Sequence, residues 1–282
     1  MTIRRVVVYL GPGDRLSDRY ILALLCDRWR HAGIEVLVLD DPTRVVDGEV
    51  AFVHVDATRR PAGYDALAFC YPRVINGGVR DISKRSISGQ IVTRDSSYGA
   101  AVIVKTNANC FDMPDASRRR RVGALLPRLW FRVTDRVLPT TARNIRRNRS
   151  YPIYASPREV PWHVWWDPEL VVEKFLPERR DGLYCLRTWT FLGRREKMSL
   201  HVSRSPVVKR ENLIASEYIT DLPAPIREAR QRLGFDYGKF DFVLHQDEPI
   251  LLDTNSTPTC AGQPTPRITA LADELASELM PG

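Results

Sequence analysis

The chain has 282 residues and a mass of 32.2 kDa, and its 42 Lys and Arg residues against 34 Asp and Glu residues give a formal charge of +8. With 44% hydrophobic and 27% charged residues its composition is globular, which excludes disordered, collagen-like and low-complexity proteins. The length allows one large domain or two moderate ones with real cores.

The first 75 residues are predicted to form a small α/β unit with a parallel sheet. Short β-branched apolar runs are typical of buried strands, and Gly33 would end a helix over residues 19–31. The turn Gly11-Pro12-Gly13 could approach a phosphate, but it lacks the third glycine of the dinucleotide fingerprint, so a plain turn is favoured. The expected elements are a strand at 6–10, a helix at 19–31, and strands at 34–39, 51–55 and 64–70.

Beyond residue 75 the pattern continues as strands and short helices joined by polar segments. Residues 76–95 form a turn-rich crossing, and residues 117–150 are rich in arginine. Trp162, Trp165 and Trp166 precede a predicted strand. The expected elements are strands at 101–105 and 170–175, a hairpin of 186–192 with 197–202, a helix at 225–233, a hairpin over 239–255 and a helix at 268–279.

Cysteines and apolar runs indicate a soluble protein of a reducing compartment, which we expect to be the cytoplasm. The five cysteines are an odd number and none forms Cys-x-x-Cys, which argues against a disulfide framework or a zinc site. The apolar run near the N-terminus is too short for a signal peptide, and nothing approaches the roughly 20 apolar residues of a membrane span.

The hairpin over 239–255 carries the most informative polar residues. Both of its halves alternate polar and apolar side chains around a turn predicted at residues 246–248. A turn centred on residue 247 places Asp241 opposite Asp253 and Lys239 opposite Asn255. These four side chains would share one face, and the opposite face would be apolar, formed by Phe240, Phe242, Leu244, Ile250 and Leu252.

Two opposed carboxylates repel each other on a strand pair unless a cation lies between them. Two Asp and one Asn offer the hard oxygen ligands that suit Mg²⁺. The alternative is a solvent-facing hairpin whose aspartates are hydrated. The hairpin by itself leaves both interpretations open.

The segments Phe-Asp241-Phe and Leu-Leu-Asp253-Thr-Asn255-Ser-Thr-Pro resemble the C-terminal signature of ATP-grasp enzymes, which include glutathione synthetases, D-alanine–D-alanine ligases and peptide glutamate ligases. The resemblance implies that Asp241, Asp253 and Asn255 bind the Mg²⁺ of ATP, with Mn²⁺ as an alternative ion. The family usually has Glu where this chain has Asp253.

Upstream segments resemble the family's nucleotide-binding segments in the same order. Lys84 and Lys105 resemble its phosphate-binding lysines, and Glu173 with residues Lys174, Phe175 and Leu176 resembles the segment that reads adenine. Arg187, Arg204, Arg210 and Asn212 resemble its phosphate-facing Arg and Asn positions. Lysine is scarce here, with six lysines in all, and Lys84, Lys105, Lys174 and Lys239 fall within these motifs.

The resemblance implies an α/β (α+β) fold with a Rossmann-like domain followed by the two-subdomain ATP-grasp fold. The expected divisions are a pre-ATP-grasp domain at 1–75, an N-terminal subdomain with an Arg/Trp-rich insert at 76–176, and a C-terminal subdomain with the Mg-binding hairpin at 177–282.

The implied activity is that of an ATP-dependent ligase. It would join a small carboxylate, or a peptide, to an amine or thiol through an acyl phosphate and release ADP and phosphate. Lys239, Arg204 and Arg187 would hold the substrate carboxylate or stabilise the oxyanion. The oligomeric state is left open, with a dimer as one option.

Two alternatives follow from other features. The family's glycine-rich loop is replaced by residues 106–113 without a glycine, and Cys185 stands where many relatives have an acidic residue, so a regulatory or scaffold protein that binds ATP without ligating is one alternative. The runs Arg118–Arg121 and Arg143–Arg149 would suit a nucleic acid, but no recognition motif accompanies them, and solvated helix faces or an anionic substrate explain them better.

Overall fold

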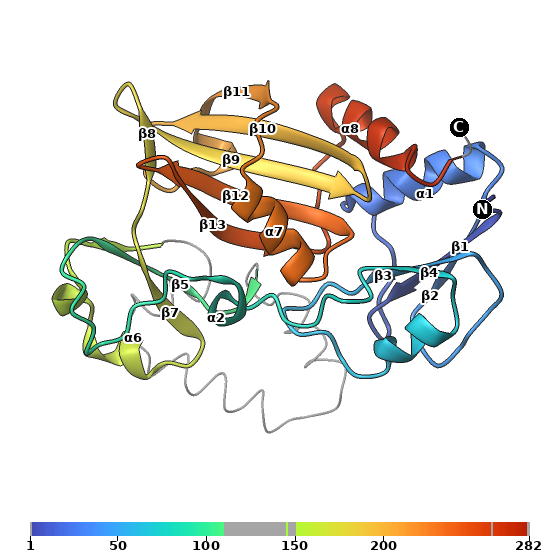
Figure 1. Cartoon of the computed structure of the whole chain (residues 1–282), viewed down its shortest axis with the longest axis horizontal. Helices are drawn as coiled ribbons and strands as arrows, with labels where there is room; N and C mark the ends of the chain where they lie inside the picture. Colours follow the sequence, from blue (N-terminus) through green and yellow to red (C-terminus); the bar gives the residue numbers. More distant parts are fainter. Residues whose placement is uncertain (1, 110–144, 146–150, 261, 281–282) are drawn as a thin grey trace.

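Three β-sheets organise the computed structural model, which describes residues 2–109, 145, 151–260 and 262–280. Figure 1 shows a four-stranded sheet beside the two termini, a large sheet at the other end, and a small sheet below the large one. The α/β fold class predicted from the sequence is therefore confirmed. The divisions at residues 75 and 176 stay a prediction.

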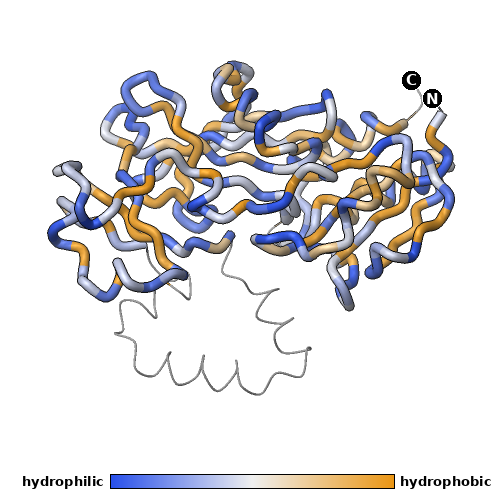
Figure 2. The backbone as a smooth tube through the Cα atoms, turned by 60° about the horizontal axis from the view of Figure 1, so that its bottom comes forward, coloured by the Kyte–Doolittle hydropathy of each residue, from blue (hydrophilic) through white to orange (hydrophobic). Residues whose placement is uncertain are grey.

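The four-stranded sheet is parallel, in the order β2-β1-β3-β4. Its strands are β1 (Arg5–Leu10), β2 (Glu35–Leu39), β3 (Val50–His54) and β4 (Arg73–Ile75). Strand β1 is buried on both faces, as continuous β-branched runs predict. Long hydrophobic stretches mark this part of the molecule, near the two termini, in Figure 2.

The segment predicted as a strand at 64–70 is instead a 3₁₀ helix, η1 (Tyr64–Phe69), and the fourth strand follows it. Tyr64 and Leu67 are buried while Phe69 is 93% exposed, so the apolar spacing there is three rather than two. Gly63, at φ 104°, turns the chain into this helix.

The large sheet is antiparallel and runs β11-β10-β9-β12-β13, with β8 paired to β9. Its strands are β8 (Glu178–Arg180), β9 (Leu183–Leu192), β10 (Arg195–Ser203), β11 (Leu213–Ile219), β12 (Tyr237–His245) and β13 (Glu248–Asn255). One face carries the fully buried Trp189, Phe191, Phe240 and Phe242, which pack against Ile226 of α7 (Ala224–Arg232). Both predicted hairpins are confirmed.

The small sheet has the order β6-β5-β7, formed by β5 (Val102–Thr106), β6 (Ile153–Tyr154) and β7 (Leu170–Lys174). One of its faces packs Val102, Val104 and Val172 against Val160, which follows η3 (Pro157–Glu159), and Val164 of α6 (Trp162–Trp166). Alternation then places Lys105 and Glu173 on the other face.

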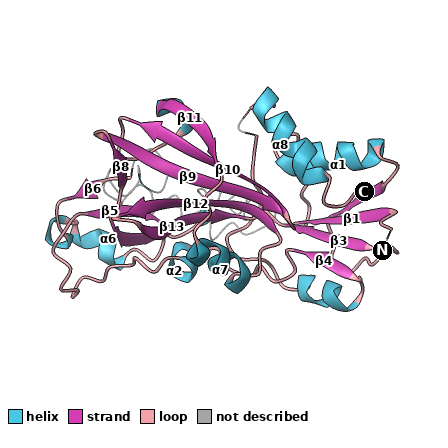
Figure 3. Cartoon of the chain, turned by 45° about the horizontal axis from the view of Figure 1, so that its top comes forward, coloured by secondary structure: helices cyan, strands magenta, loops and turns pink. Residues whose placement is uncertain are grey.

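Helices pack beside these sheets. Helix α2 (Lys84–Ile87) lies in the crossing segment 76–95, and Figure 3 shows it with α7 beside the β12–β13 hairpin. The C-terminal α8 (Pro266–Ala276) packs on α1 (Ile21–His31), where Trp29 Nε1 donates to the Ala276 carbonyl at 3.0 Å. The last helix of the chain therefore covers the first unit.

Some predicted features lie outside the described residues. They are Cys110, most of the arginine-rich segment, of which Ile145 is described, and residues 110–113 of the loop without glycine. Within the described ranges, every helix is too short or too polar to cross a membrane.

We predict that Gly234 tolerates no side chain. Its φ is +70°, and an added Cβ would lie 2.9 Å from the carbonyl carbon of Gly78. Gly234→Ala should lower the free energy of unfolding by about 2 kcal/mol, measured by urea denaturation, because it combines left-handed strain with a backbone clash. Gly89→Ala, with nothing within 4 Å of the added Cβ, is the control. Equal stability of the two variants would contradict the prediction.

Candidate functional site

The β12–β13 hairpin sets the geometry of the candidate site. Gln246 and Asp247, at φ 51° and 66°, form a two-residue turn, and β13 already begins at Glu248. Phe242 pairs with Leu251, and a register shift next to Asp241 then brings Asp241 opposite Asp253. The predicted pairs Asp241–Asp253 and Lys239–Asn255 are confirmed.

The turn and the apolar face were predicted incorrectly by one residue. Glu248 lies in the strand, Leu251 rather than Leu252 faces Phe242, and Ile250 faces Val243. A shorter turn moves the register by one position, and the bulge at residue 252 moves it back. The two deviations cancel at the carboxylates, which is why the predicted polar face survives.

The two opposed carboxylates are accompanied by two ammonium groups. Lys239 Nζ lies 3.1 Å from Asp241 Oδ1, and Lys84 Nζ contacts Asp253 Oδ1. Burial, and then the nearby carboxylate of Asp253, raise the pKa of Asp241, while Lys239 acts against that shift. The site is thus a pair of negative groups whose proximity depends on cations.

Lys84 links the small sheet to the hairpin. It is the first residue of α2, its backbone amide donates to the Asn107 carbonyl at 2.8 Å just beyond β5, and Arg85 donates to the Leu170 carbonyl at 3.0 Å. The Lys84 side chain is only 7% exposed and reaches Asp253. The contact therefore joins two elements that are 169 residues apart.

Lys105 and Glu173 form a second charged pair on the small sheet. Lys105 Nζ lies 2.7 Å from Glu173 Oε2, and Glu173 is 2% exposed with no hydrogen-bond partner for Oε1 among the described residues. A buried carboxylate oxygen without a donor is costly and suits a ligand that brings an N–H group.

The segment after Glu173 is only partly available for such a ligand. The amide of Lys174 donates to the Gln90 carbonyl and that of Phe175 to the Ala101 carbonyl, both at 2.9 Å. The Lys174 ammonium lies 5.3 Å from the centre of the Tyr98 ring. Leu176, half-buried, follows at the start of the link to the large sheet.

Arg187 lies on the opposite face of the large sheet from Asp241. It pairs with Phe242 across the strands, and its guanidinium donates two hydrogen bonds of 2.9 Å to Glu178, which is also buried. Burial acts to raise the pKa of Glu178, but these bonds and one from the Leu244 amide lower it overall. The structure therefore does not bring Arg187 to Asp241 and Asp253.

Three further predicted residues lie near the β10–β11 connection. Arg204 and Arg210 are exposed, and Arg210 donates to the Cys260 carbonyl at 3.3 Å. Asn212 shapes the short helix η4 (Arg210–Asn212), since its Oδ1 accepts from the Lys209 amide at 2.8 Å and its Nδ2 donates to the Val207 carbonyl at 2.8 Å. Asn212 therefore serves its own loop.

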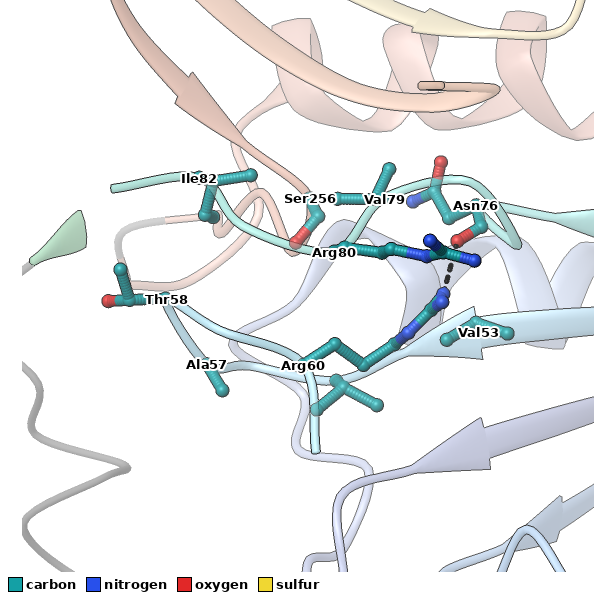
Figure 4. A pocket seen from close by; sticks show the side chains of 10 residues that line it. Val53, Ala57, Thr58, Arg60, Asn76, Val79, Arg80, Ile82 and Ser256 are labelled. Carbon is teal, nitrogen blue, oxygen red and sulfur yellow. Dashed lines mark hydrogen bonds between the residues drawn. The ribbon is translucent and has the colours of Figure 1, made fainter. Parts of the chain in front are cut away.

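The sequence patterns missed contributions from the first unit. Figure 4 shows a small pocket beside Ser256, which follows Asn255, with Arg60, Asn76 and Arg80 around it. Asp56, from the segment after β3, accepts a hydrogen bond from Thr257 at 3.0 Å. Thr257 lies within the segment around Asp253 and Asn255 that resembles the ATP-grasp signature, but no sequence signal connects it to Asp56.

The donor set at the hairpin fits Mg²⁺. Two carboxylates and an amide oxygen are ligands that this ion prefers, and the opposed carboxylates already attract cationic groups. Within the described ranges, no three or more His, Cys, Asp or Glu side chains cluster as a metal site. Asp241, Asp253 and Asn255 would each offer one side-chain ligand, and phosphate oxygens and water are the ligands with which Mg²⁺ usually completes its coordination.

No protein-family model and no curated protein matches the chain. Solved structures similar over nearly the full chain include the RimK domain protein ATP-grasp from Sphaerobacter thermophilus DSM 20745, at 13% identity and a TM-score of 0.48, covering 99% of this chain and 100% of that one.

Two further similar structures are a D-alanine–D-alanine ligase from Bacillus anthracis complexed with ATP (14% identity, TM-score 0.48, 98% and 96% of the two chains) and the ATP-grasp ligase PsnB complexed with minimal precursor (13%, 0.48, 96% and 98%).

We predict that Arg187 stabilises the protein through Glu178. Arg187→Ala should lower the free energy of unfolding by about 3–5 kcal/mol at neutral pH, because it leaves the buried carboxylate of Glu178 without the guanidinium that neutralises it. A lowered folded-state pKa makes this stabilisation fully present above the ordinary carboxyl value of 4.5 and lost as the pH falls through the folded-state value.

Denaturation as a function of pH checks this prediction. The cost of Arg187→Ala should shrink below about pH 4.5. Arg227→Ala breaks the more exposed pair with Glu196 and should cost at most about 1 kcal/mol at any pH. A cost for Arg187→Ala that is small or independent of pH would contradict the role assigned to Glu178.

Proposed function

We propose that the chain is an ATP-dependent ligase that joins a carboxylate to an amine or thiol. The observation that carries the proposal is the opposed pair Asp241–Asp253, accompanied by Lys239 from the same hairpin and Lys84 from a separate element. A solvated hairpin face would not require a nearly buried lysine of α2 to contact one of its aspartates.

The residues of the small sheet suit the nucleotide. Lys105 offers an ammonium for phosphate, and the unpartnered Oε1 of Glu173 could accept from an exocyclic amino group such as that of adenine. Backbone amides at 174 and 175 are already used, so base recognition would rest on Glu173 and the carbonyl groups of this segment.

The reaction would proceed in two balanced steps. A substrate carboxylate oxygen attacks the γ-phosphorus of ATP, forming an acyl phosphate while ADP leaves with the bridging oxygen. The amine nitrogen then attacks the acyl carbon, phosphate leaves with that carboxylate oxygen, and the nitrogen loses a proton. Acceleration would come mostly from positioning and electrostatics.

The chain's own cations have distinct places in this proposal. Lys84 and Lys105 would bind phosphate oxygens, so Lys84 would leave Asp253 when nucleotide enters. Lys239, two residues before Asp241, would face the developing negative charge. Mg²⁺, or Mn²⁺, held by Asp241, Asp253 and Asn255 would supply charge neutralisation on the phosphates.

The arginines assigned from the sequence differ in whether their side chains are available for a ligand. Exposed Arg204 remains a candidate for the substrate carboxylate, and Arg210 for phosphate. Arg187 and Asn212 keep structural hydrogen bonds, so we give them no direct contact with the reactants. The acid and the amine are left as a small molecule or a peptide.

We predict that Asp253→Asn and Asp241→Asn each lower ADP release by about 100-fold or more, because each removes a negatively charged ligand of the metal that would neutralise the phosphates. Asp247→Asn is the matched control, since it lies in the turn of the same hairpin at a positive φ that Asn tolerates. ADP release over panels of carboxylates and amines is the measurement. Retained turnover in Asp253→Asn would refute the metal assignment.

The alternative of an ATP-binding scaffold gives a different result. Under the ligase proposal, ATP with Mg²⁺ should raise the melting temperature of the wild type, and some carboxylate and amine pair should release ADP. Asp253→Asn should lose most of the thermal shift. A full thermal shift with no ADP release from any pair would favour the scaffold.

A further inference from the structure

A hydrogen-bonded chain connects the first α/β unit to the candidate metal ligand Asn255. Asp56 lies two residues beyond β3, at the carboxyl edge of the parallel sheet where open α/β folds hold functional groups. Its Oδ1 accepts from Thr257 Oγ1 at 3.0 Å. Thr257, which is 3% exposed, lies two residues beyond β13.

Backbone hydrogen bonds fix Thr257 against this edge. The Ile21 amide donates to the Pro258 carbonyl at 3.0 Å, the Cys260 amide donates to the Arg19 carbonyl, and Tyr20 forms a bridge with Thr259. The main chain just after Thr257 is therefore held by the segment before α1, and strand β13 ends two residues before Thr257. The position of Thr257 thus does not depend on one flexible side chain.

Thr257 contacts Asn255 through two donors of unequal strength. Its amide donates to Asn255 Oδ1 at 2.8 Å, and its hydroxyl oxygen lies 3.3 Å from the same atom. The amide can only donate, so it orients the Asn255 oxygen rather than the NH₂ group toward Thr257. One of the two lone pairs on Oδ1 is thereby used, and the second would serve a metal.

The hydroxyl of Thr257 has a single proton, and Asp56 competes for it. The charged Asp56 carboxylate is the closer and stronger acceptor, at 3.0 Å against 3.3 Å for Asn255. Asp56 is itself oriented by Tyr20 Oη at 2.5 Å and Arg19 Nη2 at 3.1 Å, both donating to Oδ2. Asp56 thus draws the hydroxyl proton away from the amide oxygen.

We infer that Asp56 is a positioning residue that keeps the second lone pair of Asn255 Oδ1 open for a divalent cation by holding the Thr257 hydroxyl proton. This inference rests on the proposed function, because it takes Asn255 as a metal ligand. Without Asp56, the Thr257 hydroxyl would donate fully to Asn255 and occupy the lone pair that the cation needs. Through Asp56, the first unit would therefore influence the metal affinity of the hairpin from outside it.

The consequence is a rescue that a purely structural role would not produce. Asp56→Ala should weaken cation binding by about tenfold or more, the range for residues that orient metal ligands. Thr257→Val keeps the amide donor but removes the competing hydroxyl. The double variant Asp56→Ala/Thr257→Val should therefore bind the cation within about threefold of the wild type, a strongly non-additive result.

The experiment titrates Mn²⁺ into the full chain with saturating non-hydrolysable ATP analogue and follows bound Mn²⁺ by electron paramagnetic resonance. Asp273→Ala is the matched control, because it breaks the 2.8 Å pair between Arg28 of α1 and Asp273 of α8 without approaching Asn255. It should leave the Mn²⁺ affinity unchanged. Melting temperatures show whether each variant is folded, and Asp56→Asn, with an intermediate loss, replaces Asp56→Ala if that variant does not fold.

The outcomes separate the two levels of the proposal. Tenfold weaker binding in Asp56→Ala with rescue in the double variant supports the positioning role. Two results overturn the positioning role and leave the ligase proposal standing. One is that Asp56→Ala binds Mn²⁺ as tightly as the wild type does. The other is that the double variant binds Mn²⁺ no more tightly than Asp56→Ala does. Absence of Mn²⁺ binding by the wild type with the nucleotide analogue overturns the proposed function and this inference together.

Discussion

The structure of the site depends on the electrostatic repulsion between Asp241 and Asp253. Directly opposed carboxylates on neighbouring antiparallel strands are unfavourable, and burial makes the charged form of Asp241 harder to maintain. Two ammonium groups offset this repulsion, that of Lys239 on the same hairpin and that of Lys84 from α2. A site arranged in this way is suited to exchange protein ammonium groups for the cation of an incoming polyanion.

The two faces of the large sheet differ in character: one contributes to the hydrophobic core, and the other carries the charged residues of the candidate site. One face buries Trp189 and Phe240 in the core and holds the Arg187–Glu178 pair, whose bonds are satisfied within the protein. The other face carries the charged residues of the hairpin. Because alternate residues point to opposite faces, strand register decides which arginines can reach a ligand.

The first unit takes part in the site through contacts rather than through its own chemistry. The segment after β13 is bonded to the backbone around Tyr20, and Thr257 connects Asn255 to Asp56. The C-terminal helix returns to α1 and adds the buried bond of Trp29. Movement between the first unit and the hairpin would therefore change the surroundings of Asn255.

The amino-acid sequence by itself determined most of the strands and helices, though not the 3₁₀ helix at 64–69. It also determined the opposed aspartates, because alternation over residues 239–255 is a local property of the strands. It misplaced the turn and the apolar face, since a two-residue turn and a compensating bulge leave no separate compositional trace. The sequence also placed Arg187 and Asn212 among the ligand-binding residues; in the structure Arg187 bonds to Glu178 and Asn212 bonds within its own loop, so their predicted role stays a prediction.

Only the tertiary structure decided which distant groups meet. The contact of Lys84 with Asp253 and that of Asp56 with Thr257 join residues 169 and 201 positions apart. Such pairs arise from the way the sheets pack, and spacing along a single chain carries no information about them.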